Sequence, residues 1–124
     1  MSERLVGVFE LGWEPVEVYV DFKSSGGTFT SLEGTNKLVK MVIGVNEDNW
    51  FRVLDIIIHE STELAITRKG ARYCASGTIT KDHSVYLFSF SHPVFSDICC
   101  IVADFLSQVY DIIKDLWSNR NTFA

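Results

Sequence analysis

The sequence predicts one α+β domain over residues 1–124, with a mostly antiparallel sheet of about five strands and two main helices packed on one side. A chain of 124 residues suits a single domain, and 47% hydrophobic with 22% charged residues is typical of a packed globular protein. Apolar and polar residues alternate in some segments and follow a helical period in others. The resulting order is three strands, a helix, two strands and a long helix, with a tail at 118–124 that we expect to fray.

The first half of the chain contains the three predicted strands. Residues 5–11 form the first strand, and Gly12-Trp13-Glu14-Pro15 is typical of a turn. Residues 16–23 alternate between apolar and polar side chains, which predicts a half-exposed strand in a hairpin with the first. Residues 24–36 contain three glycines and many hydroxyls, so we expect a loop there. The β-branched, apolar run at 38–45 predicts a more buried strand.

The first helix is predicted to begin at Asn46-Glu47-Asp48-Asn49, which offers cap residues and acidic groups at the positive end of the helix dipole. It ends at Thr67-Arg68-Lys69-Gly70, where cations and a glycine are typical of a helix C-terminus. An apolar stripe at helical spacing predicts its buried face. That stripe comprises Trp50, Val53, Leu54, Ile57, Ile58 and Ala65.

Two short strands and a long helix are predicted for the second half. The strands cover residues 71–76 and 84–90, on either side of a polar turn region. Ser91-His92-Pro93 then opens the second helix, because proline suits the first helical turn, and the helix runs to about Trp117. Its apolar stripe is Val94, Phe95, Ile98, Ile101, Val102, Phe105, Leu106, Val109, Ile112, Ile113 and Leu116.

Charge and cysteine usage narrow the function classes. A net charge of −5 argues against a protein that binds nucleic acid through basic contacts. No segment is long and apolar enough to cross a membrane, and the N-terminus lacks the features of a signal peptide, so we predict a cytoplasmic protein. Cys74, Cys99 and Cys100 are an odd set with an adjacent pair, which favours partly buried, reduced thiols over disulfides.

One candidate site stands out in the first predicted helix. His59 and Glu63 are four residues apart, so both side chains lie on the same face and can bind one metal ion. Glu60 can hold a water beside that ion as the general base, as in the His-Glu-x-x-His motif of zinc peptidases. A zinc ion would need a third protein ligand, for which His92 is the best candidate and His83 the reserve.

Two features argue for a plainer interpretation of this site. The motif has Glu63 where zinc peptidases have histidine, although a carboxylate oxygen can also ligate zinc. The same residues are compatible with solvated glutamates that pair with Arg68 or Arg72, a hydrogen-bonded His59 and a helix-capping His92. The pattern is therefore compatible both with a metal site and with ordinary surface and capping roles for these residues.

The chain resembles small zincin-like proteins of phages and prophages. The resemblance rests on Asn49-Trp50-Phe51-Arg52-Val53-Leu54-Asp55-Ile56-Ile57-Ile58-His59-Glu60 after a strand, and on Tyr86-Leu87-Phe88-Ser89-Phe90-Ser91-His92 followed by Phe95. It spans roughly residues 38–113. It implies a minimal zinc-metallopeptidase fold in which His59, Glu63 and His92 hold zinc and Glu60 is the general base.

Three functions follow as expectations. The first is a degenerate zincin-like metal-binding domain that acts as a minimal metal-dependent hydrolase or peptidase. The second is a non-catalytic, phage-encoded binding protein on the same fold, with a host protein as partner: an inhibitor of a host defence system or an assembly factor. The third is a homo-oligomer formed through the wide stripe of the second helix. Candidates for an exposed binding patch are the aromatic residues Trp13, Tyr19, Phe29 and Trp117.

Overall fold

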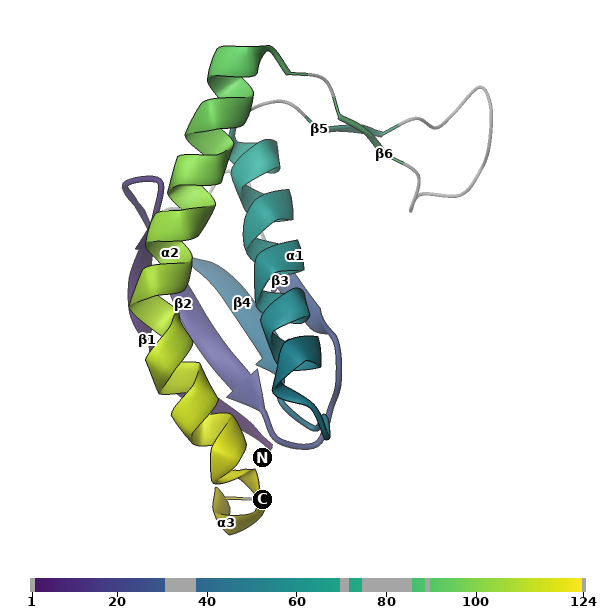
Figure 1. Ribbon diagram of the computed structural model, residues 1–124, viewed down its shortest axis with the longest axis vertical. Helices are drawn as coiled ribbons and strands as arrows, with labels where there is room; N and C mark the ends of the chain where they lie inside the picture. The colour runs from purple at the N-terminus through teal and green to yellow at the C-terminus, as the bar shows by residue number, and fades with distance from the viewer. Residues whose placement is uncertain (1, 31–37, 70–71, 75–85, 89, 124) are drawn as a thin grey trace.

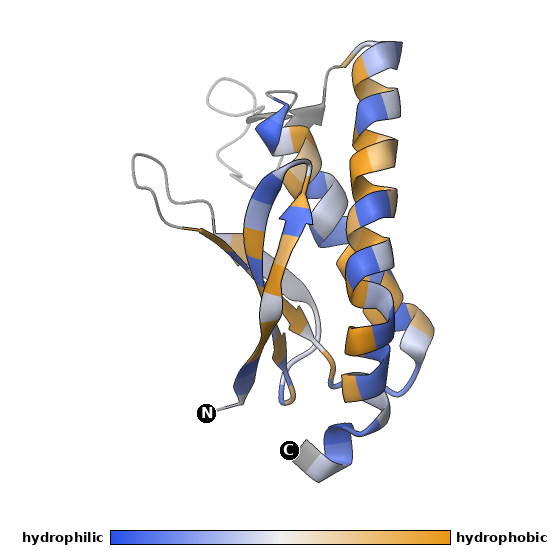
Figure 2. Ribbon diagram, turned by 90° about the vertical axis from the view of Figure 1, so that its left-hand side faces the viewer, coloured by the Kyte–Doolittle hydropathy of each residue, from blue (hydrophilic) through white to orange (hydrophobic). Residues whose placement is uncertain are grey.

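Four strands form one mixed sheet in the computed structural model, which describes residues 2–30, 38–69, 72–74, 86–88 and 90–123. The strands are β1 (Glu3–Leu11), β2 (Glu14–Asp21), β3 (Gly27–Thr30) and β4 (Val39–Gly44), in the order β1-β2-β4-β3. The helices α1 (Trp50–Arg68) and α2 (His92–Ser118) run in opposite directions over the same face of this sheet (Figures 1 and 2). This confirms the predicted α+β class with both main helices on one side.

The strand pairing differs from the prediction in two respects. The hairpin of β1 and β2 is confirmed, and β3 also pairs antiparallel with β4. However, β2 and β4 are parallel, because the chain crosses from the end of β2 through β3 before it enters β4. β3 itself lies inside the segment predicted to be a loop, so that prediction was wrong for residues 27–30.

The prediction of one sheet of about five strands was also wrong. The two short strands of the second half, β5 (Arg72–Cys74) and β6 (Tyr86–Phe88), pair antiparallel with each other and form a separate two-stranded sheet. This ribbon leaves the end of α1, extends away from the main sheet, and returns to the start of α2 (Figure 1). The two strands therefore connect the helices without widening the main sheet.

The predicted ends of α1 are confirmed to within a residue or two. The side chain of Asn49 accepts a hydrogen bond from the Phe51 N–H, which satisfies one of the free donors at the helix start. The buried face of α1 is rotated from the predicted stripe, however, since Ile58 is exposed. Its buried residues are Val53, Ile57, Glu60, Ser61, Leu64, Ala65 and Ile66.

The long helix α2 packs on both the sheet and α1. Its buried residues are Ile98, Phe105, Val109, Ile113 and Leu116, all of them in the predicted stripe. At its C-terminal end, the Trp117 Nε1–H donates to the carbonyl oxygen of Glu47, and Trp50 donates to the Tyr110 hydroxyl. These two hydrogen bonds hold the start of α1 against the C-terminal half of α2.

The outer edge of the sheet is also tied to α2. The side-chain amide of Gln108 accepts from the Glu10 N–H at 3.0 Å and donates to the Glu10 carbonyl oxygen at 2.9 Å. The C-terminal residues 118–124, which we predict to fray, contain the short helix α3 (Arg120–Phe123). None of the helices in the described part of the chain is long and apolar enough to span a membrane.

Candidate functional site

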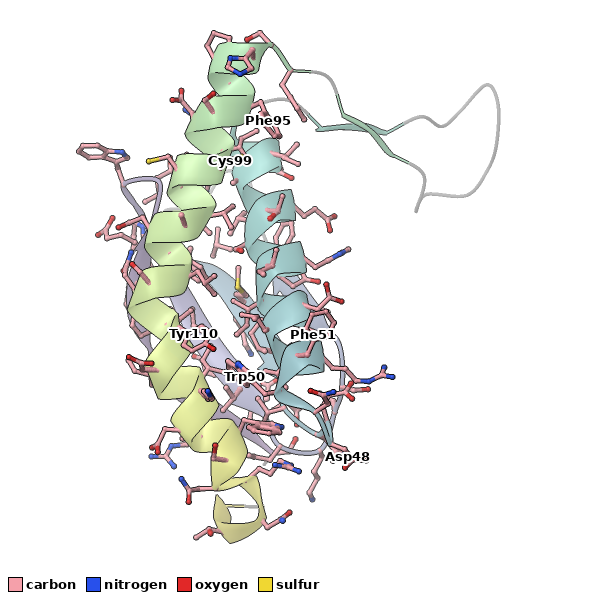
Figure 3. The ribbon with its side chains drawn as sticks, in the orientation of Figure 1. Asp48, Trp50, Phe51, Phe95, Cys99 and Tyr110 are labelled. Carbon is pink, nitrogen blue, oxygen red and sulfur yellow. The ribbon has the colours of Figure 1, made fainter. Side chains whose placement is uncertain are left out.

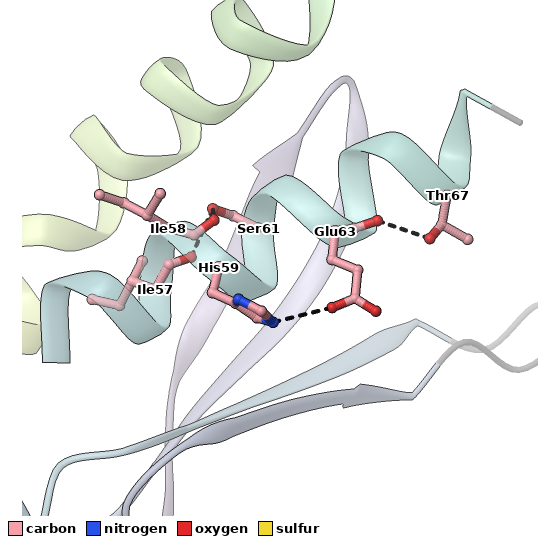
Figure 4. Close-up of polar contacts among 6 residues, drawn as sticks. All are labelled: Ile57, Ile58, His59, Ser61, Glu63 and Thr67. Carbon is pink, nitrogen blue, oxygen red and sulfur yellow. Dashed lines mark hydrogen bonds and ion pairs between the residues drawn. The ribbon is translucent and has the colours of Figure 1, made fainter. Parts of the chain in front are cut away.

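His59 and Glu63 come together on the exposed side of α1, as their four-residue spacing predicts. His59 Nε2 lies 3.3 Å from Glu63 Oε2 (Figure 4), and the side chains are 65% and 23% exposed. They line a shallow surface hollow with Asp55, Ile58, Thr62 and Ile66. The pair therefore offers one nitrogen and one carboxylate to solvent from adjacent helical turns.

Glu60 points to a different side of the helix. It is only 7% exposed, and a Cβ added at Gly27 of β3 would lie 2.8 Å from its Cγ, so its stem packs against the edge of the sheet. Burial raises the pKa of the Glu60 carboxyl, His59 opposes this shift, and Glu63 adds to it. A raised pKa suits a general base, but the stem of Glu60 packs against β3, and Glu60 is not among the residues that line the hollow of His59 and Glu63.

His92 is far from this pair. It is the first residue of α2, at the end of the molecule where α1 finishes. Lys69 Nζ lies 3.6 Å from Asp97 Oδ2, which fixes the alignment of the two antiparallel helices. From the Lys69–Asp97 contact, His59 lies toward the start of α1, whereas His92 lies in the opposite direction, at the start of α2. The two histidines are therefore roughly 20 Å apart along the helix axes.

The described residues do not assemble the predicted zinc site. Within the ranges that the structure describes, no group of three or more His, Cys, Asp and Glu side chains lies close enough to hold a metal ion. His83, the reserve ligand, and the side chain of Cys74 lie outside the described residues. Cys99 and Cys100 are free and exposed on α2, so the expectation that they are partly buried was wrong.

A second candidate site surrounds the β1–β2 turn. Leu11 pairs with Glu14, so the connection consists of Gly12 and Trp13 alone. Both have positive φ, 62° and 73°, as a two-residue turn of type I′ requires. Glycine adopts this conformation readily, whereas a bulky residue such as tryptophan does so rarely. Trp13 is also 93% exposed, so its indole is held at the tip of the hairpin and points into solvent.

Arg68, in the last turn of α1, holds this hairpin tip in place. Its Nη1 donates to the Leu11 carbonyl oxygen at 2.8 Å, and its Nε lies 3.0 Å from Glu14 Oε2. Longer contacts of 3.5 Å reach the carbonyl oxygens of Glu14 and Pro15. Burial lowers the pKa of the guanidinium and Glu14 opposes that shift. The residues on both sides of Trp13 are therefore fixed by one side chain.

Surface hollows flank Trp13 on both sides, where the turn meets α2. One is lined by Trp13, Arg68, Lys69, Asp97, Cys100 and Ile101 among others. The other is lined by Glu10, Gly12, Trp13, Cys100, Ile101 and Asp104. Figure 3 shows Phe95 and Cys99 on the first turns of α2, at the same end of the molecule as the turn. The site thus combines an apolar floor with several carboxylates.

The sequence indicated only part of this second site. Trp13 was among the four aromatic candidates for an exposed patch, and its exposure is confirmed. Phe29 and Trp117 instead pack against the core, and Tyr19 is half-buried under Lys40, whose Nζ lies 4.6 Å from its ring centroid. Arg68 was predicted to act as a cation at the end of the helix or to pair with a glutamate of its own helix. Neighbouring residues in the sequence do not indicate that its side chain reaches the hairpin.

Comparisons with protein-family models, curated proteins and solved structures find no match to this chain. The resemblance to zincin-like proteins therefore stays a prediction, and functional arguments depend on the geometry of the two sites.

Proposed function

We propose that this chain is a non-catalytic binding protein that engages a protein partner through Trp13 and the adjoining start of α2. The observation that carries the proposal is an almost fully exposed tryptophan held with φ of 73° at a two-residue turn. A bulky residue in this conformation costs about 1–3 kcal/mol, and such strain is concentrated at functional positions. Because the indole is exposed, it adds almost no packing in the isolated domain that would offset this strain.

Pre-organisation supports the same proposal. Tryptophan is among the residues that contribute most to protein interfaces, since it buries a large area with little loss of side-chain freedom. Arg68 fixes the backbone on both sides of Trp13, so docking the indole requires little further ordering of the turn. The hollows on either side of Trp13 leave room for a partner to enclose the indole.

Site-specific photo-crosslinking tests this function. The full chain carries p-benzoylphenylalanine in place of Trp13, or in place of Phe51 as a matched control. Phe51 is an exposed aromatic at the opposite end of the helical layer (Figure 3). A partner crosslinked only from position 13 is then purified, and its affinity is measured by calorimetry. Trp13→Ala should weaken binding about 30-fold or more, whereas Phe51→Ala should leave it unchanged. Equal effects of the two substitutions would refute the proposal.

Divalent-metal binding is a second candidate function, and the 3.3 Å approach of His59 to Glu63 favours it. Two ligands at helical spacing can hold a zinc ion when a further group completes its coordination. Hydrolysis would also need Glu60 to reach the metal-bound water, and the burial of Glu60 against β3 weighs against that step.

Metal analysis of untagged protein by mass spectrometry decides this second candidate. About one zinc per chain, lost in Glu63→Ala and kept in His92→Ala, would support a site built on the His59–Glu63 pair. Loss in both variants would support the three-ligand set that the sequence predicts. Absence of zinc after zinc addition and dialysis would exclude metal binding as the function of this pair.

A further inference from the structure

The hollow between the β1–β2 turn and α2 combines an aromatic wall with two carboxylates. Its lining residues are Glu10, Gly12, Trp13, Cys100, Ile101 and Asp104. We propose that this hollow receives a cationic side chain of the protein partner, an arginine or a lysine, stacked on the Trp13 indole between Glu10 and Asp104. This inference rests on the proposed function, since it names the chemistry that the partner must present at Trp13.

The aromatic wall is open because of the turn itself. At Gly12 a Cβ would lie 3.1 Å from the Ile101 Cδ1, which is closer than ordinary van der Waals contact, so glycine allows the turn to pack tightly on α2. Trp13, the next residue, is almost fully exposed. The indole therefore forms a raised side of the hollow with Ile101 at its floor. Guanidinium and ammonium groups bind over indole faces, and arginine adds planar stacking.

The acidic side of the hollow is held by a hydrogen-bonded network. Gln108 Nε2 donates to Asp104 Oδ2 at 3.0 Å, and the same amide bonds to the N–H and the carbonyl oxygen of Glu10. One side chain thus fixes a carboxylate of α2 and the backbone of β1 on the same side of Trp13. A cation entering the hollow meets the Asp104 carboxylate already held in place, with Glu10 beside it, which favours charge-assisted hydrogen bonds.

Charge complementarity identifies the occupant. Four acidic residues, Glu10, Glu14, Asp97 and Asp104, line the two hollows that flank Trp13. Among the described residues that line these hollows, the two cations are engaged: Arg68 lies 3.0 Å from Glu14, and Lys69 lies 3.6 Å from Asp97. A purely apolar occupant would bury Glu10 and Asp104 without compensation, and an anionic one would be repelled. A cation satisfies both the indole and the carboxylates.

Nuclear magnetic resonance titration of the full chain tests the inference with two defined probes. N-acetyl-arginine N-methylamide carries the cation, and the citrulline analogue is its uncharged isostere. The arginine probe should shift the Trp13 indole N–H and the Gly12 and Asp104 amides saturably. Binding of the citrulline probe should be at least about fivefold weaker. Equal shifts with the two probes would overturn the inference.

Variants that remove carboxylates distinguish a contact with Glu10 and Asp104 from a general effect of negative charge. Glu10→Gln combined with Asp104→Asn should reduce arginine binding about fivefold or more, whereas Asp111→Asn on the exposed face of α2 should not change it. Unchanged binding in the double variant would contradict the inference. With the crosslinked partner, loss of affinity in Trp13→Ala but not in the double variant would refute the cationic contact and leave the binding function intact. No loss in Trp13→Ala would refute both.

Discussion

The guanidinium of Arg68 is hydrogen-bonded to the carbonyl oxygen of Leu11, 57 residues earlier in the chain. The same group contacts the Glu14 carboxylate, so the last turn of α1 holds both ends of the Gly12–Trp13 connection. The conformation of the exposed indole therefore depends on a partly buried contact between a helix end and a hairpin.

Removal of the Arg68 guanidinium should destabilise the fold and loosen the turn. We expect Arg68→Met to lower the free energy of unfolding by about 1.5–3 kcal/mol, because hydrogen bonds that involve a charged group contribute about that much. Urea denaturation followed by circular dichroism measures the change. Arg52→Met, at an exposed position of the same helix, is the matched control and should stay within about 0.5 kcal/mol of the wild type. If Arg68→Met lowers the free energy of unfolding no more than Arg52→Met does, the contacts of Arg68 with Leu11 and Glu14 do not stabilise the fold.

Replacement of Trp13 by glycine should stabilise the domain while it removes the binding site. Glycine adopts positive φ without steric cost, so Trp13→Gly should raise the free energy of unfolding by about 1 kcal/mol. The exposed indole makes few contacts that its removal could lose. Trp13→Ala keeps a Cβ at positive φ and should show no comparable gain. If thermal and urea unfolding show that Trp13→Gly is less stable than Trp13→Ala, the backbone of Trp13 is not strained.

The contact between the start of α1 and the end of α2 should depend on the Trp117 indole N–H. Trp117→Phe keeps an aromatic ring but removes the 2.8 Å bond to the Glu47 carbonyl oxygen. We expect a loss of about 1–3 kcal/mol in the free energy of unfolding, since a partly buried carbonyl is left without that donor. Phe51→Leu is the control, because Phe51 is exposed on the neighbouring helix. Hydrogen exchange at the N-terminal turn of α1 should accelerate only in the Trp117 variant.

The buried Glu60 should make stability depend on pH. Burial raises its pKa from the ordinary value of 4.5, so the folded chain retains this proton to higher pH than the unfolded chain does. The stability linked to Glu60 is complete below pH 4.5 and is lost as the pH rises through the folded pKa. Glu60→Gln, which stays neutral, should therefore stabilise the protein more at pH 8 than at pH 5.

Urea midpoints at the two pH values measure this effect. Asp55→Asn, at an exposed position on the same helix, is the control, and the difference between its midpoints at the two pH values sets the baseline for removing one carboxylate. A Glu60→Gln variant with the same gain at pH 5 and pH 8 would show that the carboxyl titrates normally in the folded chain.

Local patterns in the sequence predicted most of the elements and the first hairpin, but not β3 or the pairing between distant strands. The caps at Asn49 and the alternation of β2 depend on residues close in the chain, so α1 and the first hairpin were predicted correctly. β3 has only four residues, two of them threonine and one glycine, and it is a strand because it pairs with β4. The parallel contact of β2 with β4 likewise depends on the path of the intervening chain, which local composition does not specify.

The same limit applies to the candidate sites. The four-residue spacing predicted the contact of His59 with Glu63, because both lie on one helix. The distance to His92 depends on how far α2 extends past α1, and helical periodicity does not contain that information. Glu60 was predicted beside the metal pair from its position in the motif, yet the packing of α1 on β3 turns it inward.

The two bonds from Gln108 to Glu10 also affect how the sheet meets other molecules. β1 is an outer strand, and the free backbone groups of such a strand can template fibrils or edge-to-edge aggregates. Near the turn, the amide of Gln108 occupies the donor and acceptor positions that an incoming strand would use. The helix that forms the floor beside Trp13 therefore also occupies, at Glu10, the backbone groups that strand addition to this sheet edge would need.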